Sequence, residues 1–547
     1  MAENYNDILK VRIGRVTAKA AADNYFPIIG QTVKIDATTR WGQTSEWQIQ
    51  DGDGQTVTGA GNLTLQKDSK SIKIANSGEL KQKFIGRNSV SEVEVIKAIY
   101  AMEAQTLPYF EVTVTEVLRV GDRGYIDILA ENGYATSRRN TAVARIYKEN
   151  ETQPVKNISF DTTRPGPTIW ASTSFSFNNS SDRGVYDVEV DVTDTLTGVT
   201  LTKRINKFIT VTPKLCPKPA DTTQGYEVAF TYSAYTSYVA LPGTQEFECR
   251  LWRNVDNSGL NYAEMILPQG NPNNGQWDGP DCSMLPAGTT LVVKRDPKEP
   301  EDYPIRLFLK GNKSQNETNE NGTPNFTREA PLIITHDEED VMQWGWRAYG
   351  AFSPGQNMRN IVVDGYGYHK TGIHFYPFDS NMFTDSCLFI NNGSSFFEIF
   401  GLDIDGAGFA GISAKTDPNA NNTWFWRENG WEMYLDIHHC TFRNTVGEGV
   451  YVGYFDTSEK EGTNSNGEIV KFHAHIIRDL RVYRCSFIQN GYDSVQINNA
   501  RGVEFCYNLL DGCGYRREPS QGSAFSCTMD GKIYNCTVKN NYNIIGV

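Results

Sequence analysis

Cysteine is missing from the chain before Cys216, and the ten cysteines of the sequence contain no Cys-x-x-Cys pair. This spacing argues against a zinc knuckle and against a thioredoxin-like redox site. Long apolar runs are missing as well: no stretch reaches the roughly 18 residues that a transmembrane helix needs. We therefore predict no metal, no cofactor and no membrane insertion.

Positive charge is scarce in this sequence. Lys and Arg number 52 against 65 Asp and Glu, which gives a net charge of -13. An acidic surface repels phosphate backbones, so nucleic acid is not an expected partner. The segment 1–16 also lacks the basic and apolar parts of a secretory signal peptide, so we expect the chain to be made without one.

What the sequence does contain is glycine, aromatic residues and short alternating segments. The 547 residues include 48 glycines and 12% aromatic residues. Short apolar-polar alternations separated by turn residues favour strands over helices, so we predict an all-β protein. The length exceeds that of one ordinary domain, and we expect three or four.

Residues 1–103 and 104–213 are each predicted to form a β-sandwich. Trp47 suits a core position on a strand that enters a hairpin, and 184–194 is a strand with clean alternation. Both segments resemble PKD-type, immunoglobulin-like domains, which implies spacer or adhesion modules. Residues 214–280, with prolines near their start, are expected to be a linker and a small β connector or cap.

The C-terminal part repeats itself. Cys440, Cys485, Cys506 and Cys536 each follow a short apolar strand, at unequal intervals. A coil of a parallel β-helix takes roughly 20–25 residues, so the shortest interval, from Cys485 to Cys506, fits one bare coil and the longer intervals carry insertions. We therefore expect the four thiols to stack in successive coils, with Gly and Asn at the corners.

The segments His-Cys-Thr-Phe-Arg-Asn-Thr at 439–445 and Gly-Glu-Gly-Val-Tyr-Val-Gly at 447–453 resemble right-handed parallel β-helix proteins of the pectate-lyase-like superfamily. The segment 285–293 looks like the opening coil of such a protein. The resemblance implies a right-handed parallel β-helix over 281–547. The superfamily includes lyases, hydrolases, phage tailspikes and adhesins, and tailspikes of this fold imply a homotrimer or larger assembly.

Two carboxylates are the candidate catalytic residues. Aligning the second strands of successive coils puts Glu448 and Asp493 at equivalent corners, beside an outward column with Tyr451 and Gln496. Close carboxylates raise one pKa, as a glycosidase requires. The alternative is a pair of solvated acids at a coil corner.

An insertion rich in aromatic residues supplies the candidate ligand contacts. Residues 415–434 contain Trp424, Trp426, Trp431 and Tyr434. Sugar rings stack on such side chains, so we predict glycan binding here, together with Tyr451 and Gln496. The alternative is that these aromatics pack the loop onto the wall of the helix or into a neighbouring subunit.

Two functions remain open from the sequence. The first is a fibre or spike of a phage tail or contractile-injection-like particle, which recognises a cell-surface glycan and joins other particle proteins as a homo-oligomer. It would be located on a virion or an extracellular particle. The second is a secreted polysaccharide lyase or glycoside hydrolase.

Overall fold

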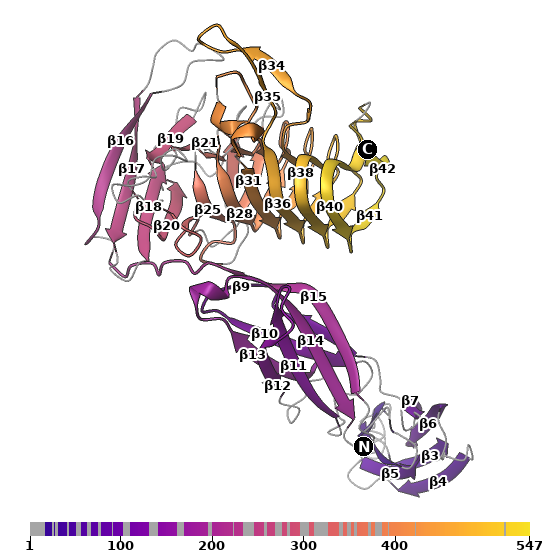
Figure 1. Ribbon diagram of the computed structural model, residues 1–547. Helices are drawn as coiled ribbons and strands as arrows, with labels where there is room; N and C mark the ends of the chain where they lie inside the picture. Colours follow the sequence, from indigo (N-terminus) through magenta and orange to yellow (C-terminus); the bar gives the residue numbers. More distant parts are fainter. Residues whose placement is uncertain are drawn as a thin grey trace, which may run out of the picture. The chain divides into compact units, whose positions relative to one another are not determined.

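The computed structural model describes two compact units, residues 1–214 and 215–547. The described residues are 17–23, 27, 31–40, 43–50, 56–62, 67–74, 78–89, 91–101, 110–130, 140–160, 169–194, 200–221, 224–233, 246–255, 260–267, 276–281, 285–295, 306–310, 326–337, 343–346, 352–354, 358–369, 373–377, 386–391, 393–421, 423–430, 432–518 and 521–546. Their elements are strands and short 3-10 helices, so the prediction of an all-β protein is confirmed (Figure 1). Within these ranges, no helix is long and apolar enough to span a bilayer.

The first unit begins with two sheets around one core. One sheet is β1 (Thr17–Ala22), β2 (Thr32–Arg40) and β5 (Lys67–Lys73). The other is β4 (Thr56–Asn62), β3 (Thr44–Gln50), β6 (Gly78–Arg87) and β7 (Glu92–Ala101). Trp47 is 1% exposed and meets the Phe84 ring edge-on at 4.8 Å between centroids. Its indole N–H donates to Asp68 over 2.7 Å, which removes the cost of burying that polar group.

Two further sheets of the first unit enclose a second core. One is β13 (Ile169–Ser176), β10 (Arg123–Ala130) and β8 (Phe110–Val114). The other is β12 (Pro154–Ser159), β11 (Asn140–Lys148), β14 (Gly184–Asp194), β15 (Thr200–Thr212) and β9 (Val117–Arg119). Strand β14 has the bounds that alternation predicts, with Val188, Val190 and Val192 in the core.

The second unit opens with three antiparallel strands. Strands β16 (Tyr226–Ser233), β17 (Glu246–Val255) and β18 (Asn261–Leu267) pair antiparallel in that order. From β18 onward the pairing becomes parallel, because β18 pairs with β20 (Thr289–Arg295) and β19 (Gln276–Asp281) pairs with β21 (Arg306–Lys310). Parallel stacking thus starts inside 214–280, upstream of the expected start at residue 281.

The remaining strands form three parallel faces, which we call the coil stack. Face A continues from β20 through β22 (Leu332–Thr335), β25 (Arg359–Asp364), β28 (Ser395–Phe400), β31 (Glu432–His438) and β36 (Ile476–Tyr483) to the later parts of β38 (Val495–Cys506) and β40 (Ser523–Tyr534). Figure 1 shows β28, β31, β36, β38 and β40 side by side.

Faces B and C complete each coil. Face B runs through β21, β24 (Phe352–Pro354), β27 (Leu388–Ile390), β30 (Ile412–Ala414), β33 (Val450–Val452), the first parts of β38 and β40, and β42 (Asn543–Gly546). Face C consists of β23 (Gln343–Trp346), β26 (Ile373–Pro377), β29 (Leu402–Asp405), β32 (Thr441–Arg443), β37 (Ser486–Ile488), β39 (Leu509–Asp511) and β41 (Thr537–Lys539). The chain visits faces A, C and B in turn.

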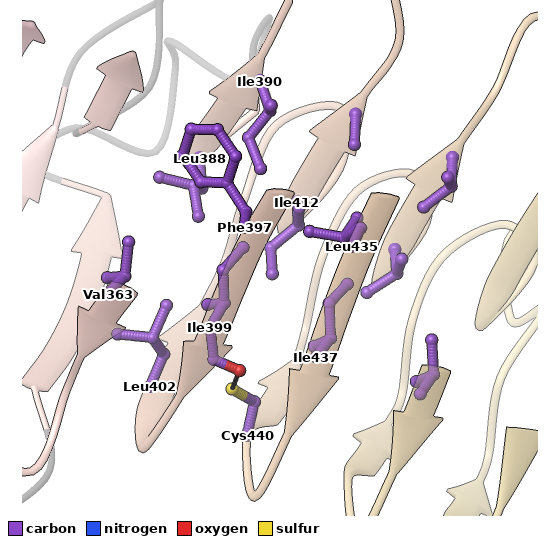
Figure 2. Close-up of a cluster of buried hydrophobic side chains, with 14 of the residues drawn as sticks. Val363, Leu388, Ile390, Phe397, Ile399, Leu402, Ile412, Leu435, Ile437 and Cys440 are labelled. Carbon is purple, nitrogen blue, oxygen red and sulfur yellow. Dashed lines mark hydrogen bonds between the residues drawn. The ribbon is translucent and has the colours of Figure 1, made fainter. Parts of the chain in front are cut away.

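The interior of the stack is apolar and close-packed. Figure 2 shows Ile399 of face A, Leu402 of face C and Ile412 of face B lining the same interior. Phe442 and Phe487 stack on each other from adjacent coils, with centroids 5.0 Å apart. Each such side chain contributes roughly 1.5–3 kcal/mol by its burial, so the repeat stabilises itself coil by coil.

Each of the last five corners between faces A and C contains one residue in the left-handed region. In coil order the corner residues are Gly401 (φ 71°), His439 (φ 53°), Arg484 (φ 56°), Tyr507 (φ 56°) and Asn535 (φ 52°). The sequence predicts Gly and Asn at corners, and three of these positions instead hold His, Arg and Tyr. Each of the three costs roughly 1–2 kcal/mol of backbone strain, which the stacked strands on either side compensate.

The predicted stacking of four thiols is wrong at one coil. Thr441, Ser486, Leu509 and Thr537 pair in register, so Cys440, Cys485 and Cys536 align in one column. Asn508 occupies the position predicted for Cys506.

Asn508 explains the break in the thiol column. Its side chain accepts the Cys485 N–H over 2.8 Å and donates to the Val482 carbonyl over 2.9 Å, so it joins neighbouring coils as a thiol cannot. Cys506 lies earlier in its coil, in register with Tyr483. The bare coil therefore runs from Ser486 to Leu509, which is longer than the interval between Cys485 and Cys506.

Candidate functional site

Face B carries a column of outward side chains, and we call this surface the wall. Ser413 pairs in register with Tyr451, Tyr451 with Gln496, and Gln496 with Ser526. Strand alternation turns these residues outward, because their neighbours Val450 and Val452 belong to the core. Tyr451 and Gln496 thus stand in one column, as the alternation predicts, and their role as ligand contacts stays a prediction.

Tyr451 points away from the core but is covered by its surroundings. It is 6% exposed, its ring lies 5.4 Å from that of Phe409, and the Lys415 ammonium lies 5.4 Å from its centroid. Burial raises the pKa of the Tyr451 hydroxyl, and the Glu448 carboxyl adds to the rise. The wall is therefore closed at Tyr451, whereas Gln496 and Ser526 are only half-buried.

The two candidate catalytic acids occupy equivalent corners at the edge of the wall. Gly449 donates its N–H to the Ser494 carbonyl over 2.9 Å, which fixes Glu448 opposite Asp493. A Cβ on Gly449 would meet the Phe487 ring at 2.6 Å, so Gly449 takes the inward position. Glu448 lies at the corner before β33 begins, as predicted.

The expectation that these acids reach solvent is wrong. Glu448 is 0% exposed and Asp493 is 1% exposed. The Asp493 carboxylate accepts the Ser523 N–H over 2.6 Å, whereas neither carboxyl oxygen of Glu448 has a hydrogen-bond partner among the described residues. In this arrangement no substrate can touch either carboxyl, because the surrounding side chains cover both.

The two acids nevertheless differ in their pKa values. Burial raises the pKa of Glu448 to about 8, and the charge of Asp493 adds to the rise while Lys415 opposes it. Burial raises the pKa of Asp493 to about 6, opposed by hydrogen bonds from Ser523 and Ser526. At neutral pH Glu448 is therefore protonated and Asp493 mostly ionised. A glycosidase needs one protonated and one ionised carboxyl group. The assignment of Glu448 and Asp493 as catalytic residues stays a prediction.

Two long insertions leave face B at consecutive coils and fold against each other. Loop one is 415–431, with η5 (Thr423–Phe425) and η6 (Arg427–Asn429); loop two is 453–475, with the hairpin β34 (Lys460–Thr463) and β35 (Ile469–Phe472). We call them together the loop module. The Arg427 N–H donates to the His473 carbonyl over 3.1 Å, and His473 pairs with Glu428 at 2.5 Å.

Trp426 is the centre of the loop module rather than an exposed sugar contact. It is 9% exposed and stacks on Phe472 at 4.9 Å between centroids, while its indole N–H donates to the Asn419 carbonyl over 3.0 Å. The alternative of loop packing therefore holds for this residue, because burying so large an apolar surface stabilises the module. The side chain of Trp424 and all of Trp431 lie outside the described residues.

Tyr434 lies on face A, not in the loop. It belongs to β31, where its ring stacks on Phe396 at 4.5 Å and its hydroxyl donates to Glu432 over 3.0 Å. One ring face and the hydroxyl are thus already engaged. The predicted placement of Tyr434 in the loop is wrong, because β31 already begins at Glu432, and its role as a ligand contact stays a prediction.

Sequence reasoning missed an exposed aromatic at the start of loop two. Phe455 is 59% exposed, and its ring lies 5.0 Å from that of Tyr454. Tyr454 has the Lys415 ammonium 5.8 Å and the Lys460 ammonium 5.5 Å from its centroid, which links it to Tyr451 through Lys415. The available signal was the pair of aromatics directly after a wall strand.

Comparisons with known proteins leave the chain without an assigned family. No family model matches it, and no curated protein matches it. Among solved structures it is similar to a DUF4785 family protein from Legionella pneumophila subsp. pneumophila (8% identity, 36% of this chain, 58% of that chain, TM-score 0.17). It is also similar to the BSP domain of a biofilm associated protein (13%, 37% and 30%, TM-score 0.14) and to the ICAM-5 D1-D4 ectodomain fragment (9%, 46% and 75%, TM-score 0.18). TM-scores this low carry no argument about fold or function.

Proposed function

We propose that the coil stack is a right-handed parallel β-helix of the pectate-lyase-like type, preceded by two PKD-type, immunoglobulin-like sandwiches. Three parallel faces, one left-handed residue at each of the last five corners between faces A and C, and a bare coil that runs from Ser486 to Leu509 support this assignment. The two-sheet cores of the first unit are what spacer modules of that kind require.

We propose further that the protein recognises a cell-surface glycan as a fibre or spike of a phage tail or contractile-injection-like particle. The observation that carries this proposal is the loop module, because both long insertions leave the same face at consecutive coils and form one folded unit beside the wall. Irregular segments held on a rigid scaffold are where binding concentrates. Phe455 offers the exposed ring on which a sugar would stack.

Replacement of Phe455 tests the glycan proposal. We expect Phe455→Ala to weaken retention on immobilised bacterial surface polysaccharides about tenfold, because a stacked ring contributes roughly 1 kcal/mol or more. Tyr125→Ala, at a 48% exposed aromatic in the first unit, is the matched control and should bind as the wild type does. Equal retention of all three proteins would rule out the loop module as the binding site.

Particle association and oligomeric state follow from the same proposal. A fibre or spike of this type is expected to be a homotrimer or larger assembly that joins other particle proteins. Native mass measurement of the purified chain, together with mass spectrometry of purified particles, would test this. A monomer that never co-purifies with particles would contradict it.

A polysaccharide hydrolase or lyase is the second candidate function. Only the difference between the pKa values of Glu448 and Asp493 favours this function, and the burial of both carboxyl groups opposes it. Release of oligosaccharides by the wild type but not by Glu448→Gln would support catalysis. No release by either protein would remove the enzyme from consideration.

A further inference from the structure

The outward side chains of the wall are almost all uncharged. One column holds Ser413, Tyr451, Gln496 and Ser526, and the parallel column holds Lys415, Gly453, Asn498 and Thr528. Of these eight residues, Lys415, Gln496, Ser526 and Thr528 reach solvent at least in part, whereas Ser413, Tyr451, Gly453 and Asn498 are buried. The accessible part of the wall is therefore mostly uncharged, although the chain as a whole carries a net charge of -13. Lys415 is the one formal charge among these eight positions.

Several charged side chains around the wall are neutralised by ion pairs. Lys415 pairs with Asp417 at 3.0 Å, and the carboxylate of Asp456 pairs with Lys460 in loop two. Lys471 likewise pairs with Glu459 at 2.8 Å. A charged ligand that contacts Lys415, Asp456 or Lys460 would have to displace one of these ion pairs.

Negative charge at the wall edge also disfavours an anionic ligand. The carboxylate of Asp493 is buried at the corner, and Glu448 beside it would ionise at alkaline pH. A carboxylate or sulfate on a ligand seated at Gln496 would meet this negative potential, while the ammonium of Lys415 is already paired with Asp417. The buried charge of Asp493 therefore disfavours an acidic sugar at Gln496.

Hydrogen-bonding capacity remains open on the same surface. Gln496 Oε1, on a half-buried side chain, has no hydrogen-bond partner among the described residues. Ser413 Oγ lacks one as well, but Ser413 is 0% exposed and offers nothing to a ligand. Unmet polar atoms of this kind cost roughly 1–3 kcal/mol each unless a ligand or water satisfies them. Sugar hydroxyls both donate and accept, as hydroxyl and amide side chains do.

From this juxtaposition we infer that the wall beside the loop module binds an uncharged, hydroxyl-rich sugar unit through Gln496 and Ser526. The inference rests on the proposed glycan recognition and narrows it to neutral polysaccharide. Recognition comes from neutral hydrogen bonds and apolar contact, so the affinity should hardly change between low and high salt.

The test is binding of the full chain to two sets of immobilised polysaccharides. The neutral set is dextran, mannan, galactan and arabinoxylan, and the charged set is polygalacturonate, alginate, dextran sulfate and chitosan. We expect retention by at least one neutral polysaccharide, unchanged between 50 and 500 mM NaCl. The variant Gln496→Ala with Ser526→Ala should bind about tenfold or more weakly, as loss of two hydrogen bonds implies.

Two further variants serve as controls for the double substitution. Ser486→Ala with Gln489→Ala removes the same residue types from face C and should bind as the wild type does. Because Ser526 also contacts Asp493, the single variant Gln496→Ala is measured too; it removes an amide oxygen that has no partner in the described structure.

The outcomes separate the two proposals. Retention only by charged polysaccharides, or binding that 500 mM NaCl abolishes, would overturn the neutral-sugar inference and leave glycan recognition standing. Neutral binding that the Gln496 and Ser526 variants leave intact would also overturn the inference. Failure to bind any of the eight polysaccharides would overturn both.

Discussion

Two regions of the coil stack share one scaffold and differ in what they carry. The coils of β30 and β33 send loop one and loop two out between faces B and A. In the next two coils, β38 and β40 each run from face B to face A without leaving the sheet. Interior columns such as Ile437, Val482 and Phe505 continue through both regions, so the insertions add a surface without interrupting the core.

The comparison teaches that core and surface are separable in this fold. Inward residues of the bare coils, such as Val495 and Phe505, continue the columns of the loop-bearing coils. Trp426 and Phe472 instead form a small cluster of their own within the loop module. Substitutions in the two clusters should therefore affect stability in different ways.

The largest expected effect is loss of a shared core ring. Phe487→Ala should destabilise the second unit by about 3–5 kcal/mol, because it removes a fully buried ring stacked between coils. Chemical denaturation followed by circular dichroism measures this. Loss of structure confined to the bare coils would contradict the idea of one continuous core.

The next largest effect is a pH-dependent change in stability that comes from Glu448, at the edge of the loop-bearing region. The folded pKa of Glu448, about 8, lies above its ordinary value of 4.5, so its contribution to stability is complete below pH 4.5 and is lost as the pH rises toward 8. Glu448→Gln should therefore be more stable than the wild type by roughly 3 kcal/mol at pH 8, which is below the largest free-energy difference that this pKa shift allows.

Denaturation of the wild type and Glu448→Gln at pH 4.5 and pH 8 tests this linkage. The two proteins should have nearly equal stability at the lower pH. Gln489→Glu, at an exposed corner of face C, is the control and should show no such pH dependence. A constant difference between wild type and Glu448→Gln at both pH values would mean that the carboxyl does not titrate in this range.

The smallest effect should be local. Trp426→Ala removes the stacking on Phe472, so it should open the loop module at a cost of about 1–3 kcal/mol while the bare coils stay intact. Hydrogen exchange should speed up in 460–472 and remain unchanged in 495–506. Faster exchange in both segments would show that the module and the stack unfold together.

Local periodicity was enough to predict several features of this protein. The alternation in 450–452 and 495–497 identified the register that joins Tyr451 to Gln496, and 184–194 has the predicted strand bounds. Alternation works here because one face of each strand is buried, and a slip of one residue would expose the core.

Other features escaped the sequence because they depend on partners far away in the chain. Cys506 looks equivalent to Cys485, but the hydrogen bonds of Asn508 to the previous coil make Asn508 the equivalent residue instead. Likewise, nothing near Trp426 in the sequence indicates that Phe472 will cover it.

The sequence by itself determined that this is an all-β protein with repeating coils and an outward column through Tyr451 and Gln496, because strand alternation is a local property of the chain. Only the tertiary structure decided which of those residues stay accessible. Exposure depends on what the loops cover: Glu448 and Trp426 ended up buried, while Phe455 stayed 59% exposed. Such packing joins segments far apart in sequence, and no local pattern encodes it.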